Sequence, residues 1–140
     1  MEKYEDLDNI DITILRTLQK NSRLTTKELA AKIHLSTSPA FERQKRLERE
    51  GYIKGYMAVV DAEKVGNGIL VLCNIRLKQH TEDLIQQFMD AVKNIDEITE
   101  CFNTSGDYDF LIKVYAQDMK DYQQFMQHTL GRIECVGSLH

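Results

Sequence analysis

The stretch LTTKELAAKIHLSTSPAFERQKRLEREG, residues 24–51, contains two helix starts separated by a very short turn. Thr25 and Glu28 have the spacing of a capping box, which predicts a helix that ends near Ile33. Ser36 predicts the start of a second helix, which Gly51 ends. A short helix, a tight turn and a basic helix form the pattern of a helix-turn-helix, here at about residues 26–45.

The turn and the start of the second helix contain two unusual residues. Pro39, the only proline of the chain, is the third helical residue if Ser36 is the N-cap, and the first if Ser38 is the cap. Either position is among the first N–H groups, which have no intrahelical partner, so the proline marks a helix start. His34 occupies the turn, where φ is often positive, and histidine tolerates that conformation better than most residues.

The second helix carries a basic face. At 100° per residue, Ala40, Gln44 and Leu47 face the preceding helices. The N-terminal part of such a helix meets base edges, which selects Ser38, Phe41 and Glu42 as candidates for base contact. Its cations are expected to bind phosphate groups. Arg46 and Arg49 are expected to face outward, and Arg43 lies on a flank of the helix. The residues predicted to contact DNA are Ser36, Ser38, Phe41, Glu42, Arg43, Lys45, Arg46, Arg49 and Lys54. A solvated, salt-bridged helix face is the alternative interpretation of the same pattern.

Charge divides the chain into two halves. The net charge is −4, yet residues 20–54 hold 9 Lys/Arg against 4 Asp/Glu, whereas residues 61–140 hold 7 against 13. Phosphate binding depends on local positive potential, so the negative average does not exclude a nucleic-acid partner. The asymmetry predicts two domains, residues 1–60 and 61–140, with a boundary at DAEKVGNG, residues 61–68.

Several classes of protein are excluded by composition. The longest aliphatic run, residues 69–73, is too short to span a membrane, and the acidic N-terminus is unlike a secretory signal. Three cysteines without a CxxC spacing predict neither a disulfide framework nor a zinc site. We expect a soluble, cytoplasmic protein with no metal or cofactor.

Periodicity predicts the elements on either side of the helix-turn-helix. Asp8 caps a helix that runs to about Lys20, and residues 52–60 form a short β-ribbon or an extended linker. The second half alternates strands and helices in the order βαββαβ, a ferredoxin-like unit whose helices cover one face of the sheet. The predicted strands are 68–78, 97–104, 109–116 and 133–140, and the predicted helices are 82–95 and 119–131.

Two features of the second half carry candidate contacts. Leu70 and Leu72 lie on the uncovered face of the first strand, which suggests a dimer interface. Gly106 and Asp107 can form the central pair of a two-residue hairpin turn within NTSGDYDF, residues 103–110.

These motifs together resemble the Lrp/AsnC family of bacterial and archaeal transcription regulators. The resemblance rests on the helix-turn-helix, RLEREGYIKGY at residues 46–56, SGDYDFLIKV at residues 105–114 and the βαββαβ order. It implies an α+β protein with an N-terminal helix-turn-helix (winged-helix-like) domain and a C-terminal ferredoxin-like domain for ligand sensing and assembly. The implied partners are double-stranded DNA, an amino-acid effector, and copies of the chain as dimers that build octamers or larger assemblies.

The resemblance also implies where the effector binds. The turn at residues 104–109 would lie where dimers meet and effectors bind, with backbone N–H groups for a carboxylate and Asp107 or Asp109 for the α-ammonium. The implied effector-binding residues are Thr104, Ser105, Gly106, Asp107, Tyr108 and Asp109. The chain departs from the family at His34, at Gln44, where an aliphatic residue is usual, and at His140, before the longer last strand of family members.

Two other functions fit the same architecture. Siroheme decarboxylases resemble it, but their carboxylate-rich tetrapyrrole needs a cationic cavity, and residues 61–140 carry a net charge of −6. His80 and His128 lie at helix ends, and no nucleophile–base pattern is present in the sequence. A sensing or assembly module that no longer binds DNA is the other alternative, and the basic helix argues against it.

Overall fold

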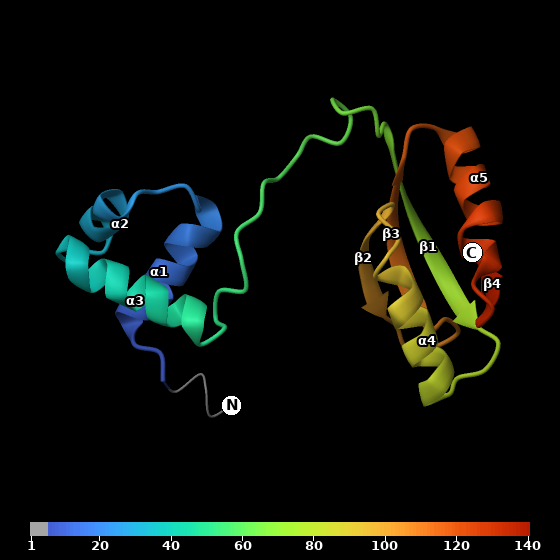
Figure 1. Cartoon of the computed structure of the whole chain (residues 1–140), viewed down its shortest axis with the longest axis horizontal. Helices are drawn as coiled ribbons and strands as arrows, with labels where there is room; N and C mark the ends of the chain where they lie inside the picture. The colour runs from blue at the N-terminus through green and yellow to red at the C-terminus, as the bar shows by residue number, and fades with distance from the viewer. Residues whose placement is uncertain (1–5) are drawn as a thin grey trace. The chain divides into compact units, whose positions relative to one another are not determined.

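The computed structural model describes residues 6–140, and the chain divides into two compact units between Val59 and Val60 (Figure 1). The first unit is helical, as predicted. Its core consists of apolar side chains from all three helices, among them Ile14, Leu29 and Leu47, each with 0% of its surface exposed. The helices are α1 (Asn9–Lys20), α2 (Thr26–Lys32) and α3 (Thr37–Arg49).

Capping boxes start the first two helices. The Thr25 N–H donates to Glu28 Oε1 and the Glu28 N–H donates to Thr25 Oγ1, both at 3.1 Å, which confirms the box predicted for α2. Asp8 and Asp11 form a second box at α1: the Asp11 N–H donates to Asp8 Oδ1 at 2.8 Å and the Asp8 N–H donates to Asp11 Oδ2 at 3.3 Å. Each box satisfies two N–H groups that a helix start leaves unpaired.

The third helix begins differently. Ser36 is its N-cap and Pro39 its third residue, but the Ser36 side chain makes no capping hydrogen bond. Proline at this position removes one of the N–H groups that such a side chain could have accepted from. Gly51 follows the helix with φ of 82°, a left-handed conformation that suits glycine, and so ends it as predicted.

Residues 52–60 contain no strand, so the predicted β-ribbon is wrong and these residues form a linker without regular structure. A ribbon needs a second strand to pair its N–H and C=O groups. No segment of residues 6–140 supplies one, and the Ile53 N–H instead donates to Leu47 O at 3.1 Å. Met57 and Val59 are 88% and 101% exposed.

The second unit has the predicted βαββαβ order. Its sheet is antiparallel with strand order β2-β3-β1-β4, and α4 and α5 pack on one face of it (Figure 1). Its elements are β1 (Ile69–Leu77), α4 (Glu82–Val92), β2 (Ile98–Asn103), β3 (Phe110–Ala116), α5 (Met119–His128), a 3₁₀ turn (Leu130–Arg132) and β4 (Val136–Leu139). None of the helices in residues 6–140 has the length and apolarity that a membrane span requires.

Alternation along the central strands separates core from surface. Cys73, Ile75 and Leu77 of β1 are buried, as predicted, and Phe110 of β3 stacks on Phe88 of α4 with ring centroids 4.6 Å apart. Burying a side chain of this size contributes about 1.5–3 kcal/mol. No helix of residues 60–140 covers the other face of the sheet, which is therefore an open surface of the second unit.

The connection between β2 and β3 is longer than predicted. The strands pair up to Asn103 opposite Phe110, and the Thr104 N–H donates to Asp109 O at 3.0 Å. A two-residue turn at Gly106 and Asp107 is therefore wrong: six residues lie between the strands. The hairpin ladder does not continue past the Thr104–Asp109 bond, because Tyr108 O accepts from Thr104 Oγ1 while the Asp109 N–H and carboxylate bond to Ile75 O and the Leu77 N–H of β1.

Candidate nucleic-acid interface and effector loop

The turn between α2 and α3 is compact because small residues line the contact. Ala30 of α2 is 3% exposed and Ala40 of α3 is 0% exposed, so the helix backbones can approach closely. His34 has φ of 57°, as predicted for this turn, and the Leu35 N–H donates to Ala30 O at 3.0 Å. This geometry fixes how α3 leaves the turn and which of its faces meets solvent.

The N-terminal half of α3 presents the predicted base-contacting side chains. Ser38, Phe41 and Glu42 are exposed, and Phe41 retains 43% of its surface. The Lys45 ammonium lies 5.3 Å from the centre of the Phe41 ring, within the range of a cation–π contact. The remaining exposed members of the predicted set are Ser36, Lys45, Arg49 and Lys54.

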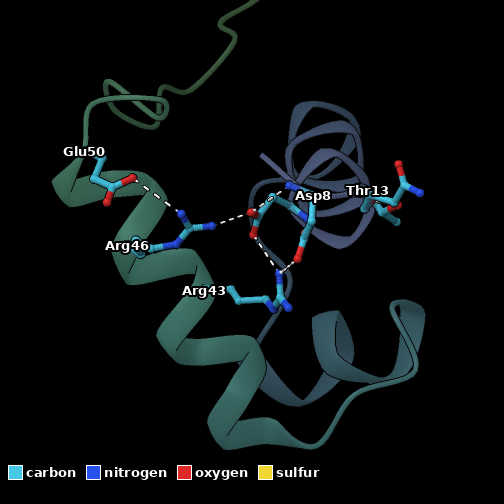
Figure 2. Close-up of polar contacts among 7 residues, drawn as sticks. Asp8, Thr13, Arg43, Arg46 and Glu50 are labelled. Carbon is cyan, nitrogen blue, oxygen red and sulfur yellow. Dashed lines mark hydrogen bonds and ion pairs between the residues drawn. The ribbon is translucent and has the colours of Figure 1, made fainter. Parts of the chain in front are cut away.

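Arg43 and Arg46 belong to a different environment, shown in Figure 2. Arg43 Nη1 lies 2.6 Å from Asp8 Oδ2 and 3.1 Å from Asp11 Oδ1. Arg46 forms ion pairs with Asp11 and, at 3.6 Å, with Glu50. The expectation that Arg46 faces outward like Arg49 is wrong, because the α3 surface at Arg46 packs toward the N-terminus of α1.

These ion pairs shift the pKa values of Asp8, Arg43 and Arg46. The hydrogen bond from Arg43, together with that from the Asp11 N–H, holds the pKa of Asp8 below its usual value. The hydrogen bond to Asp8 raises the pKa of Arg43, and the hydrogen bond to Asp11 raises the pKa of Arg46, in both cases against the effect of burial. Asp8, Arg43 and Arg46 are therefore charged near neutral pH.

Gln44 also has a partner that the sequence does not reveal. Its Nε2 donates to the Tyr56 hydroxyl at 3.0 Å, and that hydroxyl donates to Glu48 Oε1 at 2.8 Å. Burial raises the pKa of Tyr56; the bond from Gln44 opposes this rise and the contact with Glu48 adds to it. The polar side chain of Gln44 is thus hydrogen-bonded at a half-buried position of α3, by a tyrosine of the segment that follows the helix.

The second candidate site is the loop at residues 104–109. Gly106 has φ of 99°, and Thr104 Oγ1 donates to Tyr108 O at 2.8 Å inside the loop. Arg76 of β1 donates from Nε to Asp107 O at 2.8 Å, and its guanidinium lies 5.4 Å from the centre of the Tyr108 ring. The six predicted effector residues therefore form one loop tied to the end of β1.

The two carboxylates of this loop have different environments. Asp109 accepts from the Leu77 N–H at 2.7 Å and pairs with His80 Nδ1 at 2.6 Å. Burial works to raise the pKa of Asp109, but the Leu77 N–H and His80 outweigh it and hold the pKa below its usual value. The Asp107 side chain is exposed and bonds to no other side chain within residues 6–140. Asp109 thus connects the loop to β1, whereas the Asp107 carboxylate is exposed to solvent.

The open face of the sheet holds the predicted interface residues. Leu70 and Leu72 are 46% and 57% exposed. Leu70 pairs in register with Tyr115 of β3, and Phe102 of β2, 49% exposed, pairs with Leu111 of β3. Apolar side chains from three adjacent strands therefore lie on one exposed surface.

Each unit of the chain matches a family model. Residues 7–54 match a model described as winged helix-turn-helix DNA-binding, and residues 70–140 match one described as the Lrp/AsnC ligand binding domain. The leucine-responsive regulatory protein of Escherichia coli K12 is 40% identical over 132 residues, which cover 94% of this chain and 80% of that protein. The chain belongs to the Lrp/AsnC family. Its α+β architecture and helix-turn-helix are those expected of this family of transcription regulators.

Solved structures agree with this Lrp/AsnC assignment. A transcriptional regulator from Neisseria meningitidis, solved as a complex with L-methionine, is 32% identical with a TM-score of 0.89, over 96% of this chain and 86% of that one. Escherichia coli AsnC is 26% identical with a TM-score of 0.83, over 96% of this chain and 90% of that one. The fold described above is therefore that of known Lrp/AsnC regulators.

Proposed function

We propose that this protein regulates transcription by binding specific DNA sequences through the exposed face of α3. The observation that carries the proposal is the start of α3, where Ser38, Phe41 and Glu42 are exposed directly after a tight turn. In a helix-turn-helix this part of the second helix meets base edges in the major groove. The exposed residues Ser36, Lys45, Arg49 and Lys54 are then placed to contact the DNA backbone.

We infer that an amino acid controls this binding from the loop at residues 104–109. The ligand-binding family model over residues 70–140 and the L-methionine complex of the Neisseria regulator support this inference. Within the loop, Asp107 can accept hydrogen bonds from an α-ammonium group, whereas the Asp109 carboxylate already bonds to Leu77 and His80. The contact residues are Thr104, Ser105, Gly106, Asp107 and Tyr108, with Asp109 as their support.

Self-assembly is the third part of the proposed function. The open sheet face around Leu70 and Leu72 would bury its apolar side chains in a homodimer, the unit from which octamers or larger assemblies are built. A dimer also supplies two α3 helices for two DNA half-sites. We place this regulator in the cytoplasm, where its DNA lies, and assign it no catalytic activity.

Selection of bound duplexes from a random-sequence library tests the proposal. Wild type should enrich a defined sequence, and Glu42→Ala should change the preferred base at one or more positions. Glu82→Ala, an exposed glutamate at the start of α4, is the matched control and should keep the wild-type preference. A wild-type protein without sequence preference, or one whose preference Glu42→Ala leaves unchanged, contradicts DNA recognition by α3.

The effector is tested by titrating the enriched duplex with and without each amino acid, starting with L-methionine. A typical coupling changes DNA affinity about 5–150-fold, and the DNA changes ligand affinity by the same factor. Asp107→Ala should abolish the response and leave ligand-free DNA binding intact, since α3 is untouched. Failure of every amino acid to bind or to change DNA affinity contradicts the sensing role alone.

A further inference from the structure

Four charged side chains join the start of α1 to the middle of α3 (Figure 2). We call Asp8, Asp11, Arg43 and Arg46 the carboxylate clamp. Asp11 is 1% exposed and directs one carboxylate oxygen to each arginine: Oδ1 to Arg43 Nη1 at 3.1 Å, and Oδ2 to Arg46 Nη2. Asp8 adds a second carboxylate to Arg43 at 2.6 Å. The two negative and two positive charges of the clamp therefore cancel.

The carboxylates of the clamp cannot easily turn away from the arginines. Asp8 Oδ1 also accepts from the Asp11 N–H at 2.8 Å, and Asp11 Oδ2 accepts from the Asp8 N–H at 3.3 Å. Both side chains are thus part of the capping box of α1, at the helix end where the dipole favours negative charge. A DNA phosphate that took Arg43 or Arg46 away from Asp11 would leave one oxygen of this buried carboxylate without its arginine, which is unfavourable.

The other two cations of α3 lack such partners. Arg49 is exposed and makes no ion pair within residues 6–140. Lys45 lies 3.3 Å from Glu48, but both side chains reach solvent, and surface pairs of this kind exchange readily for another anion. The helix therefore carries two arginines that are already neutralised and two cations that are available.

We propose that the carboxylate clamp makes Arg43 and Arg46 positioning residues, which fix α3 against α1, and leaves phosphate binding by α3 to Lys45 and Arg49. This inference rests on the proposed function, DNA binding through α3. It revises the expectation that all four cations contact phosphate. It also assigns the acidic start of α1 a role in DNA binding, since Asp8 and Asp11 determine which cations of α3 remain available.

The salt dependence of binding to a mixed-sequence DNA duplex separates the two kinds of cation. Each phosphate contact contributes about 0.9 to the slope of log affinity against log salt. With the full-length protein, Arg49→Gln and Lys45→Gln should each make the slope less steep by about that amount per subunit. Arg43→Gln and Arg46→Gln should leave the slope unchanged. If Arg43→Gln or Arg46→Gln reduces the salt slope as much as Arg49→Gln does, the inference is overturned and the proposed function still stands. If the slope is unchanged in all four variants, both the inference and the proposed function are overturned.

A second variant keeps the test decisive if Arg46→Gln does not fold. Asp8→Asn retains an N-cap residue for α1 but removes one of the two carboxylates that hold Arg43. Its DNA affinity should rise, with a slope steeper by up to about 0.9, because Arg43 is then held by Asp11 alone and its other N–H groups can turn toward phosphate. Asp6→Asn, which removes a charge that makes no ion pair within residues 6–140, controls for net charge. An Asp8→Asn effect no larger than that of Asp6→Asn, or a weaker affinity, overturns the inference.

Discussion

The carboxylate of Asp109 links the loop at residues 104–109 to β1, so its ionisation contributes to stability. Because its folded pKa lies below the usual value, this contribution is fully present above the usual Asp pKa, about 3.9, and is lost as the pH falls through the folded pKa. Asp109→Ala should lower the free energy of unfolding by about 1–3 kcal/mol at pH 7, since the Leu77 N–H loses its acceptor.

Urea unfolding at pH 7 and in steps below pH 4 checks this prediction. The difference between wild type and Asp109→Ala should narrow as the pH falls. Asp107→Ala is the matched control from the same loop, and its exposed side chain should change stability by no more than about 0.5 kcal/mol. Equal effects of the two substitutions at pH 7 would show that Asp109 is not the link between loop and strand.

At the scale of elements, the three helix starts of the first unit differ in how their N–H groups are satisfied. Thr25 accepts a capping hydrogen bond at α2, whereas the Ser36 side chain makes none at α3. Thr25→Ala should therefore cost about 1 kcal/mol, and Ser36→Ala only a few tenths. Urea unfolding of the full chain, followed by helical circular dichroism, measures both. A Ser36→Ala cost as large as that of Thr25→Ala would show that the serine caps α3 in solution.

Helix starts, the positive φ of His34 and the βαββαβ order were predictable because each depends on residues close in sequence. The errors concern contacts between distant residues. Arg46 has the helical spacing of an outward cation, and only the packing of α1 against α3 brings Asp11 to it. The spacing of Asp8 and Asp11, three residues apart, indicates a capping box at α1 and could have been recognised in the sequence. Nothing in the sequence indicates that the same carboxylates bind α3.

The site was predictable to a similar degree. The exposed positions of Ser38, Phe41 and Glu42 follow from helical periodicity alone. The different environments of Asp107 and Asp109 in the loop at residues 104–109 could not be predicted in this way, because they depend on where β1 ends in space. The Leu77 N–H and His80 bind the Asp109 carboxylate, whereas Asp107 stays exposed. Two carboxylates that are equivalent in a sequence motif thus acquire different roles from a neighbouring strand.

At the scale of the whole molecule, the open face of the sheet exposes apolar side chains that a single chain does not cover. Leu70 and Leu72 of β1 and Phe102 of β2 expose 46%, 57% and 49% of their surfaces on either side of β3, on the face of the sheet opposite the two helices. Exposed apolar surface of this kind is unfavourable in water and favours association. Since both units belong to one chain, a dimer formed through the second unit also joins two DNA-binding units.

If the proposed dimer forms through this face, Leu72→Lys should convert it to a folded monomer, because each interface would bury two lysine charges without partners. Met119→Lys is the matched control: Met119 is 55% exposed on α5, and the substitution adds the same charge away from the sheet. Light scattering at micromolar concentration should give the monomer mass for Leu72→Lys and the wild-type mass for Met119→Lys.

The monomer should also bind a two-half-site duplex more weakly, while its affinity for a single half-site is unchanged, because each chain keeps its own α3. A wild-type protein that is already monomeric, or a Leu72→Lys variant that stays dimeric, would place the subunit contact elsewhere.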